Sequence, residues 1–90
     1  MATKEAKAFI FFNCDEDKST ESMNAAYNNE VFKDTKASRK ALWAKVAEEA
    51  AEGRVQLEDE KAAKEAVTAG DPTEAGKFLR YGTVVEVVIR

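Results

Sequence analysis

Two short segments of the sequence carry side chains with the chemistry of a binding site. In the first, Asp15 and Asp17 stand two positions apart in an acidic turn, and their carboxylates could share a hard cation such as Mg²⁺. This turn directly follows a hydrophobic segment that we predict to be a strand, and the ends of strands are favoured places for sites. The alternative is a solvated acidic loop that protects the edge of a sheet and caps the next helix.

The second segment is the start of a helix that we predict from residue 36, where basic side chains gather. These cations oppose the helix macrodipole, whose N-terminal end is positive, and each costs roughly a few tenths of a kcal/mol. We therefore expect this segment to bind an acidic partner surface or a small anion. Its binding residues would be Lys33, Thr35, Lys36, Ser38, Arg39 and Lys40. The alternative is a solvated face, or a cluster that the acidic turn neutralises within the fold.

Carboxylates gather at the opposite, negative end of the same predicted helix, where they also oppose the macrodipole. They are Glu48, Glu49 and Glu52, and a further acidic run follows at 58–60. In a second subunit these carboxylates would complement the basic segment, so they are candidate contacts for self-association.

The composition excludes several classes of catalyst. The chain has no histidine, so Ser-His-Asp and Cys-His nucleophile systems and histidine-ligated metals are absent. Its single cysteine, Cys14, forbids an internal disulfide and any CxxC motif. The nearest charges to Cys14 are carboxylates, which raise the pKa of a thiol and make it less reactive. We therefore expect no cofactor and lean against an enzyme.

Charge and hydropathy restrict the partners and the compartment. Fourteen basic and seventeen acidic residues give a net charge of −3, which argues against non-specific binding to nucleic acid. The longest apolar run is 8–12, whereas a membrane span needs about 20 residues and a signal-peptide core about 7 to 15. We expect a soluble, cytoplasmic protein with a protein partner or self-association, and without a nucleic-acid or membrane partner.

The two ends of the chain have the composition of β-strands. Residues 7–13 and 83–89 are rich in aromatic and β-branched side chains. The first strand has Ala8, Ile10 and Phe12 on one face and Phe9 and Phe11 on the other. Because both faces are apolar, we expect it to be a central strand that is covered on both sides.

Between these strands the sequence predicts three helices. The first runs over 36–52, from a cap at Thr35 or Asp34 to Gly53, which supplies the left-handed C′ position. The second lies near 59–69 and closes at Gly70; the third begins with an Asp-Pro start at 71–72, includes 78–79 and ends at Gly82. The predicted buried residues of the first two helices are Leu42, Trp43, Val46, Ala47, Ala50, Ala62, Ala63, Ala66 and Val67.

The remaining segments have weaker patterns. Apolar spacing predicts a short helix within 19–28, followed by an asparagine turn at 28–29 and a short extended piece at 30–32. Val55 and Leu57 are expected to be extended. Residues 1–5 have no pattern, and we expect them to fray.

Together these elements predict one α+β domain over residues 1–90, with a small sheet built on the paired terminal strands and packed with three to four helices. Sixteen of the apolar residues are alanines, so the helices have shallow apolar faces. Covering both faces of the sheet with them is difficult, which leaves apolar area that a second copy could bury in a homodimer.

Two functions are compatible with these residues. The first is a small non-catalytic interaction or regulatory module that binds an acidic partner through the basic segment 33–40. The alternative is a small enzyme or ligand-binding protein, with a cation at Asp15 and Asp17 or an anion at the helix start 36–40. The alternative gains weight only if the acidic turn and the basic helix start converge on one concave site.

Overall fold

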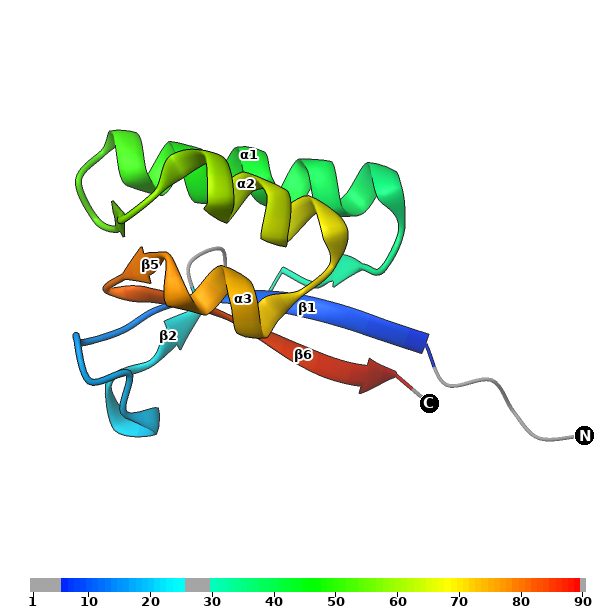
Figure 1. The fold of residues 1–90 in the computed structure, drawn as a ribbon. Helices are drawn as coiled ribbons and strands as arrows, with labels where there is room; N and C mark the ends of the chain where they lie inside the picture. Colours follow the sequence, from blue (N-terminus) through cyan, green and yellow to red (C-terminus); the bar gives the residue numbers. More distant parts are fainter. Residues whose placement is uncertain (1–5, 26–29, 90) are drawn as a thin grey trace, which may run out of the picture.

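The two terminal strands pair with each other along their full length in an antiparallel sheet (Figure 1). The fold is known from a computed structural model that describes residues 6–25 and 30–89. The strands are β1 (Ala6–Asn13), β2 (Asn24–Ala25), β3 (Phe32–Lys33), β4 (Gln56–Leu57), β5 (Leu79–Arg80) and β6 (Gly82–Ile89). β1 pairs with β6 on one side, and with β2 and β3 on the other. The prediction of paired terminal strands, with the first at the centre, is confirmed.

Three helices lie together on one face of this sheet (Figure 1). They are α1 (Lys36–Ala51), α2 (Glu60–Ala69) and α3 (Pro72–Lys77). The side chains of Thr35, Asp59 and Asp71 cap them, each accepting a hydrogen bond from the backbone N–H three residues further on. Gly70 ends α2 in the left-handed conformation, at φ 76°. The local start and stop signals therefore place all three helices.

The hydrophobic core lies between the helices and the inner face of the sheet. The inner face contributes Phe9 and Phe11 from β1 and Val84 from β6, and full burial of such side chains stabilises by roughly 1.5–3 kcal/mol each. The helices contribute Leu42, Trp43, Val46, Ala63, Val67 and Ala75 to the same cluster. Ala47 and Ala50 are half-buried, so the predicted stripe of α1 is confirmed at its larger side chains.

No described helix covers the outer face of the sheet, so the expectation that β1 is covered on both sides is wrong for the described part of the chain. The outer face carries Ala8, Ile10 and Phe12 and, opposite them on β6, Val87, Val85 and Thr83. Only Gly70 and Asp71 separate α2 from α3, and so short a connection keeps both helices on the same side. Ala8 is fully buried, whereas the other five side chains are half-buried.

Two local predictions differ from the structure. Over 19–25, the described part of the helix expected within 19–28, the structure has a single 3₁₀ turn, η1 (Thr20–Ser22), and β2, because Asn24 and Ala25 pair with the end of β1. Asparagine is a weak helix former, which left this segment free to pair. The third helix ends at Lys77, since Leu79 leaves it to pair with Leu57 in the small β4–β5 sheet.

The other short segments either agree with the expectations from the sequence or lie outside the described residues. The extended piece expected at 30–32 overlaps β3 at Phe32 only, and the extended Leu57 belongs to β4. The predicted asparagine turn at 28–29 and the predicted fraying of 1–5 lie outside the described residues.

Candidate functional site

The acidic turn lies at the carboxyl end of β1, as predicted. Asp15 and Asp17 are both exposed. A carboxylate oxygen of Asp17 accepts a hydrogen bond from the backbone N–H of Ser19 (3.1 Å), and the N–H of Asp15 donates to the hydroxyl of Ser22 (3.0 Å). These bonds fold the turn onto η1. Within 6–25 and 30–89, no group of three or more Cys, Asp or Glu side chains is placed to hold a metal ion.

The same turn is tied to α3 and contains the buried thiol. Lys18 adopts a positive φ of 54° and its amine donates a hydrogen bond to the carbonyl of Gly76. Burial raises the pKa of Cys14, the charge of Lys18 lowers it, and the charges of Asp15 and Asp17 raise it further. A thiol whose pKa is raised is a poor nucleophile at neutral pH, which agrees with the sequence interpretation.

At the start of α1, several of the predicted binding groups are used within the fold. The hydroxyl of Thr35 accepts the backbone N–H of Ser38 (3.2 Å). Arg39 donates through Nε to the carbonyl of Thr68 (2.8 Å) and through a terminal nitrogen to Asp34 (2.6 Å). Arg39 therefore fastens the start of α1 to the end of α2, and the carboxylate that neutralises it is Asp34, not one from the acidic turn.

Three cations of this segment remain exposed. We call Lys33, Lys36 and Lys40 the lysine group; their side-chain amines make no ion pair or hydrogen bond with the described residues. Four cations elsewhere have carboxylate partners: Lys7 with Glu86, Arg54 with Glu49 and Glu52, Lys77 with Glu74, and Arg80 with Glu16. The exposed Lys61 and Lys64 of α2, like the lysine group, have no such partner among the described residues. The lysine group is thus a positively charged surface that has no counter-charge in the described part of the chain.

The acidic turn and the basic helix start lie at opposite ends of β1 (Figure 1). The backbone N–H of Asp34 donates to the carbonyl of Lys7 near the start of β1 (3.1 Å), whereas Asp15 follows its last residue, Asn13. A strand rises about 3.3 Å per residue, so the length of β1 separates the two segments by about 20 Å. They do not form one concave site, and the condition that favours the enzyme alternative is not met.

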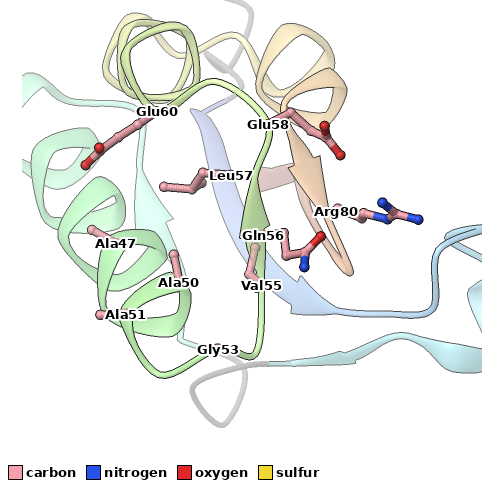
Figure 2. A pocket seen from close by; sticks show the side chains of 10 residues that line it. All are labelled: Ala47, Ala50, Ala51, Gly53, Val55, Gln56, Leu57, Glu58, Glu60 and Arg80. Atoms are coloured by element: carbon pink, nitrogen blue, oxygen red, sulfur yellow. The ribbon is translucent and has the colours of Figure 1, made fainter.

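An open hollow lies between the end of α1 and β4, with a cavity volume of about 580 Å³ (Figure 2). Its apolar wall is formed by Ala47, Ala50, Ala51 and Leu57. In Figure 2 the side chains of Gln56, Glu58 and Arg80 point away from α1, whereas the carboxylate of Glu60 lies on the side of α1. Arg80 is paired with Glu16. The carboxylates of Glu58 and Glu60 also line the hollow, so its charged groups other than the paired Arg80 are acidic.

Sequence analysis missed the role of Glu49, which is 2% exposed. One carboxylate oxygen accepts from the side-chain amide of Asn13 (3.0 Å), and the other from Nε of Arg54 (2.6 Å). The helical spacing indicates its burial, because position 49 follows Leu42 and Val46 on the buried stripe of α1. This carboxylate is part of the core and cannot complement the basic segment of another copy.

Comparisons with known proteins add no functional information, because no family model, curated protein or solved structure matches this chain. None of the helices in the described ranges is long and apolar enough to cross a membrane. The lysine group therefore stands as the candidate site on its own contacts, exposure and charge.

Proposed function

We propose that this protein is a small non-catalytic interaction module that binds an acidic protein surface through the lysine group. The observation that supports this proposal is the contrast within one segment. Arg39 is held by Asp34 and by the end of α2, whereas Lys33, Lys36 and Lys40 are exposed and have no partner among the described residues. The segment is thus anchored by one cation and presents three others to a partner.

The electrostatics favour an external counter-charge. Lys36 and Lys40 are four residues apart on α1, where like charges repel by roughly 0.2–0.5 kcal/mol, and both lie at the positive end of the helix macrodipole. Carboxylates of a partner would relieve both penalties. Each exposed ion pair contributes only about 0–1 kcal/mol, so we expect binding that is weak at single contacts and strongly dependent on salt.

A small anion fits this surface less well than a protein does. The Thr35 hydroxyl caps the helix and the Arg39 guanidinium is engaged, so the groups best suited to enclose an anion are occupied. An acidic protein surface needs only the exposed amines, which the lysine group supplies.

We propose further that the module self-associates and that it acts in the cytoplasm, where an unpaired cysteine such as Cys14 stays reduced. Self-association is supported by the sheet: the helices cover its inner face only, and β6 is paired on one side only within the described residues. Both features leave strand surface for a second copy.

The test is a titration with a ten-residue glutamate peptide, followed by the amide chemical shifts of the protein at low ionic strength. We expect shifts centred on 33–40 that disappear near 0.5 M salt, where the Debye length is below about 5 Å. The double variant Lys36→Glu/Lys40→Glu should lose them. It should remain folded, because carboxylates at the start of α1 complement its macrodipole.

The matched control is Lys61→Glu/Lys64→Glu, which reverses two exposed lysines of α2 and gives the same net charge. We expect this control to retain the peptide-induced shifts at 33–40. Equal loss of binding in the two double variants would mean that net charge alone attracts the peptide, and would overturn the assignment to the lysine group.

A further inference from the structure

One long side of β6 is unpaired in the described chain. β6 hydrogen-bonds to β1 along one side, and no described strand pairs with its other side. Its eight residues, GTVVEVVI, include a single charge, Glu86. Such an edge presents backbone N–H and C=O groups to any other strand, and proteins usually protect it with charges, proline or a covering element.

α3 lies beside only the first half of this edge. A groove beside β6 is lined by Pro72, Gly76 and Lys77 of α3 together with 83–86, and Figure 1 shows β6 continuing past the end of α3. On the second half, Val88 is 47% exposed although it shares the inner face of the sheet with the buried Val84. The second half of β6 is therefore unpaired on the side away from β1, and its Val88 is exposed.

We propose that β6 pairs antiparallel with β6 of a second copy, through 85–89 and around a two-fold axis at Val87. The inference rests on the self-association proposed above and assigns a surface to it. In this arrangement the two sheets join into one, and the outer faces of both copies lie on the same side. The proposal assigns the contact to the edge of the sheet and leaves the outer face outside it.

Charge and the position of α3 select this register. An axis at Glu86 would place two carboxylates directly opposite each other, which destabilises a strand pair. An axis at Val85 would bring the two α3 helices to nearly the same level, with Lys18 and Lys77 of one copy facing those of the other. An axis at Val87 offsets the two α3 helices by about five residues, or about 16 Å along the strands, and places Glu86 opposite Val88.

The same register covers the exposed valine. Val88 stands opposite Glu86 of the second copy, and α3 of that copy lies beside its own 83–86. α3 of the second copy therefore comes next to Val88 on the inner face and removes it from water. Val87 faces its own equivalent, and pairs of β-branched side chains stabilise neighbouring strands.

The size of the contact limits its strength. Five residues span about 17 Å, and a sheet with its side chains is about 10 Å thick, so each copy buries on the order of 200 Å². Stable dimers bury about 800 Å² per partner. We therefore expect a reversible dimer with a dissociation constant on the order of 0.1 mM.

The test combines solution mass with disulfide trapping of the full chain. Sedimentation should show the 9.9 kDa species at low concentration and a shift toward twice that mass near 0.5 mM. Val87→Cys should then cross-link under mild oxidation at least tenfold faster than Val85→Cys. The latter is a matched control, because Val85 lies on the same strand and face, and its equivalent would be about 13 Å away, beyond the reach of a disulfide.

The wild-type chain controls for the buried Cys14 and should not cross-link. Faster cross-linking at position 85 than at 87 would overturn the register. A dimer by mass in which neither cysteine cross-links would overturn edge pairing while leaving self-association intact. A single 9.9 kDa species up to 0.5 mM would overturn both, and would leave the edge to a strand of another protein. None of these outcomes changes the expected binding of the glutamate peptide at the lysine group.

Discussion

Arg54 forms an ion pair with Glu49, the one charged side chain that is buried among the described residues. Glu49 is 2% exposed, and Nε and a terminal nitrogen of Arg54 lie 2.6 and 2.5 Å from the same carboxylate oxygen. The variant Arg54→Met removes the cation and keeps much of the side-chain volume. It leaves the carboxylate with a single hydrogen bond, from the amide of Asn13, and should destabilise the fold.

The magnitude follows from the different exposure of the two partners. Breaking a fully buried ion pair costs about 3–5 kcal/mol, but the Arg54 side chain is 56% exposed, so water replaces part of the lost interaction. We expect Arg54→Met to lower the free energy of unfolding by about 2 kcal/mol. For a chain of this size that corresponds to a fall of about 10 °C in Tm.

A double-mutant cycle separates this ion pair from packing effects. Glu49→Leu extends the apolar stripe of Leu42 and Val46, and should cost about 1 kcal/mol because the amide of Asn13 loses its acceptor. In that background Arg54→Met should cost almost nothing, which gives a coupling energy of about 2 kcal/mol. Urea unfolding followed by the fluorescence of Trp43 provides the assay.

The control is Lys77→Met, which breaks the exposed pair with Glu74 and should cost less than about 0.5 kcal/mol. Equal costs of Arg54→Met in the wild-type and Glu49→Leu backgrounds would refute the argument, because the two side chains would then not be coupled.

Two further predictions concern backbone space and pH. Gly76→Ala should raise the free energy of unfolding by about 0.5–1 kcal/mol, because Ala favours the helix and the nearest atom to its Cβ is 3.6 Å away. Gly82→Ala should lower the free energy of unfolding by about 1–3 kcal/mol, because its Cβ would lie 3.1 Å from Val55 and 3.2 Å from Phe11. Effects of the opposite sign in the same urea assay would contradict both predictions. The pKa of Cys14 is raised by burial above its ordinary value of 9.0, so its contribution to stability is complete below pH 9 and is lost as the pH rises through the raised value. Cys14→Ala should flatten the decline of unfolding free energy above pH 9, and an unchanged slope would show that other groups cause the decline.

The starts of the three helices and the ends of α1 and α2 were predictable because their signals are local. Thr35, Asp59 and Asp71 cap backbone groups three residues away, and Gly53 and Gly70 both adopt positive φ. A cap depends on a few neighbouring residues and on no distant contact. The same holds for the long strands, whose composition and alternation set their type.

The short strands β2 and β5 were not predictable, because each of these two-residue strands exists only through its partner. Leu57 pairs with Leu79, a residue that helical spacing assigned to α3. Asn24 and Ala25 pair with the end of β1 in a segment whose spacing favoured a helix. Tertiary pairing overrode a weak local preference in both places.

The residues of the candidate site were predictable, but which of them bond within the fold and which remain exposed was not. The basic start of α1 and its acidic end both oppose the macrodipole, and the sequence gives no reason for either. The structure explains Arg39 by its bonds to Asp34 and to the carbonyl of Thr68, which is 29 residues away. It explains Glu49 by burial against Arg54 and Asn13.

The structure explains Arg39 and Glu49, two of the charges that oppose the macrodipole of α1. The charges that it does not explain are exposed cations at the start of the helix. Lys36 and Lys40 stand at the positive end of α1 with no partner among the described residues, and Lys33 lies on the adjoining strand. A helix optimised for its own stability would carry carboxylates there. Replacing Lys36 and Lys40 by glutamate should therefore raise the free energy of unfolding by up to about 1 kcal/mol while abolishing peptide binding. Such opposite effects on stability and binding are expected only if the lysines serve a partner and not the fold.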